Sequence, residues 1–154
     1  MSAYLDGLKL LAHRELSVVD LRSRLLDREH TADEADEAIA RLLESGALDD
    51  HRVARAYART ASKIKGRGRL RVTRELQAMG IAREVIAEAV GDVFSDIDER
   101  AMIDRALQKK LRPGRKPATM QERARLYQFL MRQGFTPAAV SAALRRIGGS
   151  TRDD

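Results

Sequence analysis

The chain has 154 residues, of which 34% are charged and only 4% are aromatic, and its formal net charge is +6. It contains no cysteine, which excludes disulfides, thiolate chemistry and cysteine-ligated zinc. No apolar run is long enough to span a bilayer, so the composition argues against a membrane protein, and we expect a cytoplasmic one. Three prolines and ten glycines in a chain of this length favour helices throughout.

The charge is distributed unevenly along the chain. Residues 1–50 contain 6 Lys/Arg and 12 Asp/Glu, a balance of −6, whereas residues 51–154 contain 23 and 11, a balance of +12. An acidic third joined to a basic two-thirds suggests that one end faces a polyanion and the other does not.

One helical pattern occurs three times, with offsets of 51 and 54 residues. Each copy has apolar residues four positions apart, then a turn residue, then a second apolar stripe, which is the spacing of a buried helix face. The copies are Leu21, Leu25, Glu29, Ala35, Ile39 and Leu42; Val72, Leu76, Gly80, Ile86, Val90 and Val93; and Leu126, Leu130, Gly134, Val140, Leu144 and Ile147. A unit this small cannot bury its own apolar face, so we predict an all-α fold of three three-helix units stacked into an elongated, curved array.

The first unit is expected to contain three helices. An apolar stripe covers about residues 3–14, and Ser17 is suited to cap the second helix. Thr31 is suited to cap the third, which Gly46 would end.

The second unit is expected to begin with a helix that Asp49 or Asp50 caps and that runs to about Lys63. Its expected buried side chains are Val53, Tyr57 and Ile64. The glycine-containing segment 65–69 interrupts the helical pattern.

Five further helices complete the prediction of nine helices in three triplets. They run from about Leu70 to Gly80, from about Arg83 to Phe94, from near Asp96 to a break at 112–117, from there to Gln133, and from Thr136 onward. The three units are expected to cover 1–47, 48–95 and 96–148, with a disordered tail at 149–154.

Nothing in the sequence indicates an enzyme. The three histidines have no second His or Cys at metal-ligand spacing, and no hydrolase or nucleotide-binding motif is present. His30 occupies the position of Ile81 and Phe135 in the other copies, which favours packing. Acidic pairs such as Asp49-Asp50 lie where helices begin, so capping explains them. We therefore expect no catalytic residue, no metal ligand and no cofactor.

Two basic clusters occupy matching positions, between the first and second helices of the second and third units. The first surrounds two glycines, which would let the backbone approach a phosphate. Aligned clusters would form a basic stripe for a nucleic-acid backbone or a protein filament, and the alternative is an ordinary solvated surface. The candidate binding residues are Lys63, Lys65, Arg67, Arg69, Arg71, Arg74, Lys109, Lys110, Arg112, Arg115 and Lys116.

The tyrosines do not favour base recognition. Tyr4, Tyr57 and Tyr127 fall on or beside apolar stripes, where core packing is expected. Backbone or shape contact is therefore favoured over base reading.

Three segments resemble blocks of the RecX regulatory family. Leu48–Tyr57 (LDDHRVARAY) is similar to its LDD block, and Lys65-Gly66-Arg67-Gly68 followed by Leu76 and Gly80 to its next block. The segment from Arg123 to Phe135 is similar to its C-terminal block. The resemblance covers about residues 3–148.

The resemblance implies a non-enzymatic regulator with the RecA recombinase and single-stranded DNA as partners. Such proteins bind the RecA filament in its helical groove and inhibit or modulate ATP hydrolysis, strand exchange and filament growth in recombination, DNA repair and the SOS response. It transfers no catalytic residue and marks Asp49, Asp50 and Tyr57 as fold markers. We expect a monomer with no membrane partner. The alternatives are a general DNA-binding protein that competes for single strands, or a helical nuclease.

Two residues depart from the family pattern. Glu29 stands where the first unit would usually have glycine, so the helix end there is expected to differ, because a left-handed cap is costly without glycine. Arg69 stands where many members have proline.

Overall fold

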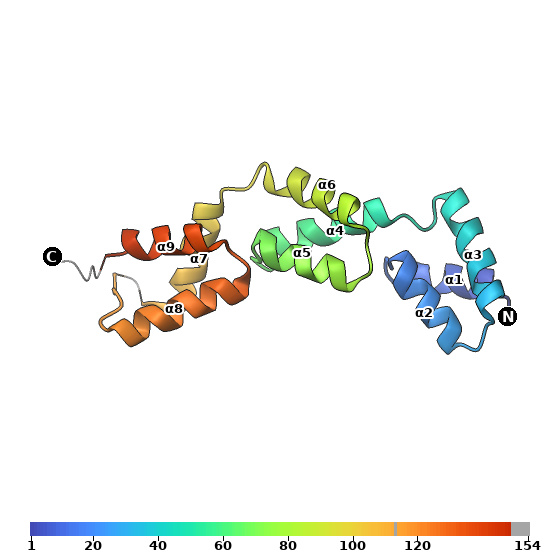
Figure 1. Cartoon of the computed structure of the whole chain (residues 1–154), viewed down its shortest axis with the longest axis horizontal. Coiled ribbons are helices and arrows are strands. Elements are labelled where there is room, and N and C mark those ends of the chain that lie inside the picture. Colours follow the sequence, from blue (N-terminus) through green and yellow to red (C-terminus); the bar gives the residue numbers. More distant parts are fainter. Residues whose placement is uncertain (113, 149–154) are drawn as a thin grey trace. The chain divides into compact units, whose positions relative to one another are not determined.

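A computed structural model describes residues 1–112 and 114–148, and it assigns nine α-helices and no strand to those residues (Figure 1). The helices are α1 Ala3–His13, α2 Val18–Asp27, α3 Ala32–Ser45, α4 Asp50–Lys63, α5 Arg69–Ala78, α6 Arg83–Phe94, α7 Glu99–Lys110, α8 Met120–Gln133 and α9 Pro137–Arg146. The predicted all-α fold of three helix triplets is confirmed. The tail expected at 149–154 lies outside the described residues.

Local capping chemistry explains where the helices begin and end. Ser17 and Thr136 accept the backbone N–H three residues on, as predicted. Thr31 forms a reciprocal capping box with Glu34, which satisfies two N–H groups that the first turn of α3 leaves open. Gly46 ends α3 in the left-handed conformation that glycine adopts without steric cost.

The predicted register of the apolar stripes is correct. Leu21, Leu25, Leu76, Leu130 and Val140 are all fully buried. Helical residues four positions apart lie on one face, so this burial identifies the face by which α2, α5, α8 and α9 pack.

One predicted core residue is wrong. Ile64 has 79% of its surface exposed, because α4 ends at Lys63 and the chain turns away from the helix there. The buried face of α4 consists instead of small side chains, Ala54, Ala58 and Ala61, next to Val53.

The described chain forms two compact units. Unit 1 comprises Met1–Ala58 and Arg74–Gly91, and unit 2 comprises Arg59–Thr73 and Asp92–Asp154 as far as it is described. The division passes through α4, α5 and α6. The domain boundaries expected from the sequence stay a prediction.

Unit 1 has its core among α1, α2 and α3, which contact one another. An ion-pair cluster lies at the edge of this core. Asp6, only 8% exposed, lies 2.7 Å from Nε2 of His30 and accepts a hydrogen bond of 3.2 Å from Arg28. The residues that correspond to His30 in the other copies are Ile81 and Phe135, and both are buried. His30 therefore combines the predicted packing role with a polar contact to Asp6.

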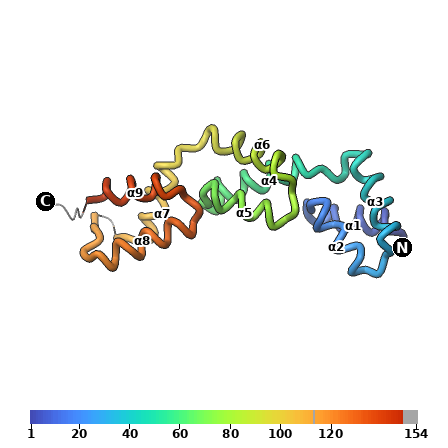
Figure 2. Tube along the Cα trace, viewed as in Figure 1, coloured from blue at the N-terminus to red at the C-terminus, as the bar shows by residue number. Residues whose placement is uncertain are grey.

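In unit 2, α7, α8 and α9 contact one another around a second core (Figure 2). Ile103, Leu130 and Phe135 are its largest fully buried side chains. No helix in the described part of the chain is both long and apolar enough to cross a membrane.

The end of α2 differs from expectation. Glu29 adopts φ 70°, the same left-handed geometry that Gly80 (φ 78°) and Gly134 (φ 105°) adopt in the other copies. The expectation of a different helix end was therefore wrong. The chain accepts the steric cost of a side chain at this position.

Candidate functional site

The two adjacent aspartates of the LDD segment have separate structural roles. Asp49 caps α4, since its Oδ1 accepts the N–H groups of His51 (2.9 Å) and Arg52 (3.3 Å). Asp50 Oδ1 accepts the N–H of Val18 at 2.9 Å and so joins the start of α4 to the start of α2 within unit 1. Asp49 thus acts as the predicted cap of α4, whereas Asp50 links the starts of two helices.

The glycines of the first basic cluster serve packing within unit 2. The N–H of Gly68 donates to Gln133 O at 2.8 Å, and the N–H of Leu70 donates to Gly134 O at 3.0 Å. A Cβ at Gly68 would lie 2.5 Å from the carbonyl carbon of Gly134. The α8–α9 turn therefore packs directly on the backbone that precedes α5.

The expectation that this loop's backbone approaches a phosphate stays a prediction, but the amides of the loop are already hydrogen-bonded within the chain. The N–H groups of Lys65, Gly66 and Arg67 donate to carbonyl oxygens at the end of α4, at 3.1, 3.2 and 2.9 Å. Because these amides are already paired, an anion here would have to be bound by side chains.

Residues from both predicted basic clusters line one pocket in unit 2. Lys63 at the end of α4 and Lys65 in the turn after it line a pocket of about 240 Å³ together with Lys109 of α7. Arg105, one helical turn before Lys109, is a fourth cation in this pocket and is not among the residues predicted from the sequence. Among the described residues, none of these four side chains forms an ion pair with a carboxylate, so the pocket has uncompensated positive charge. We name it the basic pocket.

Other predicted site residues are held by neighbouring groups in unit 2. The Arg69 guanidinium lies 5.4 Å from the ring centroid of Phe94. Arg71 donates to Gln133 Oε1 at 3.3 Å, and Arg115 pairs with Glu122 at 3.5 Å. Arg67 is half-buried.

The remaining predicted residues are dispersed. Arg112 and Arg115 line a separate pocket beside Leu107. Lys116 is exposed and lies beside Gly148. Arg74 belongs to unit 1 and is exposed. The predicted list of basic residues is therefore not brought together as a whole.

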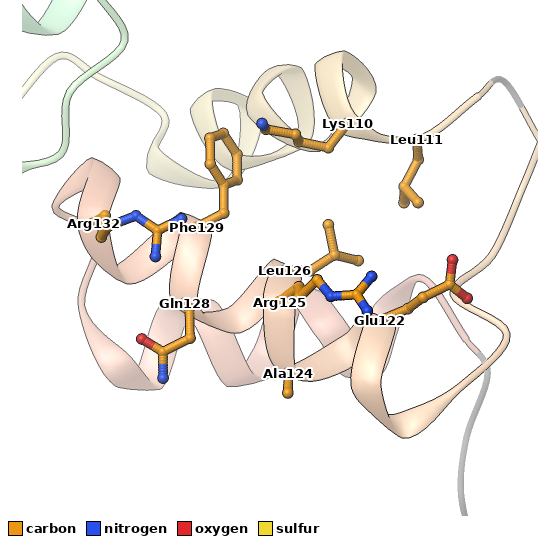
Figure 3. A pocket seen from close by; sticks show the side chains of 9 residues that line it. All are labelled: Lys110, Leu111, Glu122, Ala124, Arg125, Leu126, Gln128, Phe129 and Arg132. Atoms are coloured by element: carbon orange, nitrogen blue, oxygen red, sulfur yellow. The ribbon is translucent and has the colours of Figure 1, made fainter.

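A larger pocket of about 530 Å³ lies between the end of α7 and α8 (Figure 3). Lys110, Arg125 and Arg132 line it, and the ring of Phe129 stands at one end with Lys110 Nζ 4.7 Å from its centroid. Phe129 also lines the basic pocket. Phe129, Arg125 and Arg132 are not among the binding residues predicted from the sequence.

A sequence signal for Phe129 did exist. By the repeat offsets its counterparts are Arg24 and Glu75, both polar, whereas the neighbouring positions 126 and 130 are apolar in every copy. An aromatic residue at a position that is otherwise polar is not required for the packing of the repeat.

Family models match the chain in three successive segments. Residues 3–42 match the first three-helix domain of RecX, 49–90 the second and 98–144 the third. These segments together cover all nine helices at least in part.

Relatives with the same name align over most of the chain. A protein of Pelodictyon phaeoclathratiforme named "Regulatory protein RecX" is 33% identical over 148 residues, covering 96% of this chain and 90% of its own length. One of Halorhodospira halophila with the same name is 35% identical over 137 residues, covering 89% and 83%.

A solved structure agrees in fold. The crystal structure of RecX from Lactobacillus salivarius matches with a TM-score of 0.79 at 18% identity, and the match covers 94% of each chain. On the matches of all three domain models and of relatives along nearly the full chain, this protein belongs to the RecX family.

Proposed function

We propose that this protein is a non-enzymatic regulator that binds the RecA recombinase filament on single-stranded DNA. It inhibits or modulates ATP hydrolysis, strand exchange and filament growth in recombination, DNA repair and the SOS response. It acts in the cytoplasm as a monomer, with RecA and the single strand as partners and without a cofactor. The observation that carries the proposal is the match of all three RecX domain models, together with relatives named as regulatory proteins.

The basic pocket supports the nucleic-acid part of this proposal. Lys63 ends α4, Lys65 lies in the turn after it, and Arg105 and Lys109 belong to α7; among the described residues, no Asp or Glu lines this pocket. Such a group of side chains suits the phosphates of a strand held in a nucleoprotein filament.

A second candidate function uses the same surface. A general DNA-binding protein would contact the strand backbone through the basic pocket and would displace the recombinase by competition. The two functions differ in stoichiometry, because a competitor must cover the DNA, whereas a regulator of the filament acts through few sites.

The deciding experiment is a titration of RecA ATP hydrolysis on single-stranded DNA with this protein. Inhibition at far less than one molecule per RecA subunit supports regulation of the filament. Inhibition only at amounts that saturate the DNA supports competition for strands. No inhibition at any ratio contradicts the proposal.

A charge variant tests whether the basic pocket takes part. The triple variant Lys63→Ala, Lys65→Ala and Lys109→Ala should need several-fold more protein for the same inhibition. The matched control removes three exposed cations from the acidic third, Lys9→Ala, Arg14→Ala and Arg24→Ala. Equal loss in both variants would show that only net charge matters and that the pocket has no particular role.

A further inference from the structure

Phe129 lines two pockets of unit 2, both of which contain cationic side chains. Phe129 is half-buried and lines both the basic pocket and the larger α7–α8 pocket. Figure 3 shows the ring directed toward Lys110 and away from the axis of α8. An aromatic ring that lines two pockets can receive a planar ligand, once the flexible Lys110 side chain over the ring moves aside.

The helical repeat does not need this ring. Leu126 and Leu130, three residues before and one residue after Phe129, supply the buried face of α8. The counterparts of Phe129, Arg24 and Glu75, show that the repeat packs with polar side chains at this position.

Cations line both pockets to which Phe129 belongs. Lys65, Arg105 and Lys109 line the basic pocket. Lys110, Arg125 and Arg132 line the larger one.

The carboxylate in the larger pocket is already engaged. Glu122 accepts the N–H of Ala118 at 2.8 Å and pairs with Arg115 at 3.5 Å. It therefore does little to neutralise the cations that face the ring.

The cations of α7 are also particular to the third triplet. Asp49 and Asp98 each cap the first helix of their triplet, so α4 and α7 can be aligned on them. Lys109 and Lys110 then correspond to Thr60 and Ala61. Both the ring and the charges beside it thus depart from the repeat at the same place.

We infer that Phe129 is a stacking platform for a base of single-stranded DNA, with the flanking phosphates held by the cations of the two pockets. Alternation of an aromatic face with basic side chains is how proteins hold single strands without reading their sequence. The bases of a duplex are stacked on one another and cannot offer a face to the ring, so the site selects single strands. This contact is made by the protein alone and does not require a recombinase.

The chain contains no tryptophan, so Phe129→Trp introduces a single fluorescent reporter at the platform. We expect an oligothymidylate to quench its emission, whereas an abasic deoxyribose-phosphate oligomer of the same length should not. Equal quenching by both oligomers, or none by either, would overturn the inference.

Affinity provides the second measurement. Phe129→Leu should weaken binding of oligothymidylate by about fivefold or more, since loss of one stacked base costs about that much. Its affinity for the abasic oligomer and for duplex should be unchanged. The matched control is Tyr127→Leu, an aromatic residue on the same helix that lines neither pocket. Wild-type affinity of a folded Phe129→Leu variant contradicts the inference.

These results are separable from those on the recombinase. If the wild-type protein does not inhibit RecA but the Phe129→Trp variant shows base-dependent quenching, the proposed function is contradicted and the stacking platform is supported. If the wild-type protein inhibits RecA but no base-dependent quenching is seen, the proposed function is supported and the stacking platform is contradicted.

Discussion

At the scale of single residues, Asp6 shows how a buried charge is stabilised in unit 1. The hydrogen bond with His30 lowers the pKa of the Asp6 carboxyl, burial opposes this, and the charge of Arg28 lowers the pKa further. A carboxyl whose pKa is lower in the folded than in the unfolded state stabilises the fold above the unfolded pKa. That contribution is lost as the pH falls through the folded pKa.

The first prediction concerns Asp6→Asn. At about pH 7 the variant should be less stable than the wild type, and the difference should shrink as the pH falls below about 4. Urea unfolding of both proteins at several pH values measures this. Glu34 and Asp36, whose pKa values are also lowered, are present in both proteins and cancel in the comparison. A difference that is constant with pH would show that the carboxylate charge of Asp6 is not what stabilises unit 1.

The second prediction concerns Gly68, where a side chain has no room. Gly68→Ala places a Cβ against backbone atoms of Gly134, which cannot move aside as a flexible side chain would. We expect a loss of about 1–3 kcal/mol in the free energy of unfolding, the usual cost of overpacking.

The control for Gly68→Ala is Gly91→Ala. Gly91 lies inside α6 with nothing within 4 Å of an added Cβ. This change should stabilise the protein by about 0.5–1 kcal/mol because alanine favours a helix. Urea unfolding measures both, and equal effects would contradict the close approach of the two turns.

At the scale of elements, the same contact between neighbouring triplets occurs twice. In unit 1, the hydroxyl of Ser17, just before α2, donates a hydrogen bond of 2.6 Å to the carbonyl oxygen of Met79, just after α5. In unit 2, the N–H of Gly68 before α5 donates to Gln133 O at the end of α8. Ser17 and Gly68 are 51 residues apart, and Met79 and Gln133 are 54 apart, which are the repeat offsets. The residue before α2 thus contacts the turn after α5, and the residue before α5 contacts the turn after α8.

The third prediction separates the two aspartates that begin α4. Asp50→Ala should speed hydrogen exchange of the Val18 amide in α2, because that N–H loses its acceptor, and should cost about 1–3 kcal/mol. Asp49→Ala should instead speed exchange at His51 and Arg52 and cost about 1 kcal/mol. Amide exchange followed by NMR distinguishes the two. If both variants affect the same amides, the assignment of separate roles is incorrect.

At the scale of the whole molecule, we expect the distribution of charge to be the property that the proposed function depends on most. The balance of −6 over residues 1–50 and +12 over the rest separates the chain into parts that a polyanion would repel and attract. The structure adds that Lys63, Lys65 and Lys109 face one pocket although they lie far apart in sequence.

The fourth prediction uses the salt dependence of single-strand binding. Each phosphate contact contributes about 0.7 to the slope of log K against log salt on single strands. Removing the cations Lys63, Lys65 and Lys109 should therefore lower the magnitude of the slope by up to about 2. The triple variant Lys9, Arg14 and Arg24 to alanine should leave it unchanged. Filter binding at several salt concentrations measures both slopes, and identical slopes would place the phosphate contacts elsewhere.

Much of the fold could be read from the sequence, because its signals are local. Helix faces follow from apolar spacing, and helix ends follow from capping chemistry at residues such as Thr31 and Gly134. The same periodicity revealed the three triplets and the matching polar positions. The failure at Ile64 is also local in origin, since its apolar character suggested burial although the helix had already ended.

The candidate site depended on contacts that the sequence does not encode locally. Only the tertiary structure shows that the amides around Gly66 are paired, that Gly68 packs on Gly134, and that Arg105 joins Lys65. The sequence by itself determined the helices, their triplet repeat and the charge of each segment, because these depend on neighbours along the chain. Which cations share a pocket, and which aromatic ring lines two pockets, depends on packing between helices distant in sequence, and only the tertiary structure decides it.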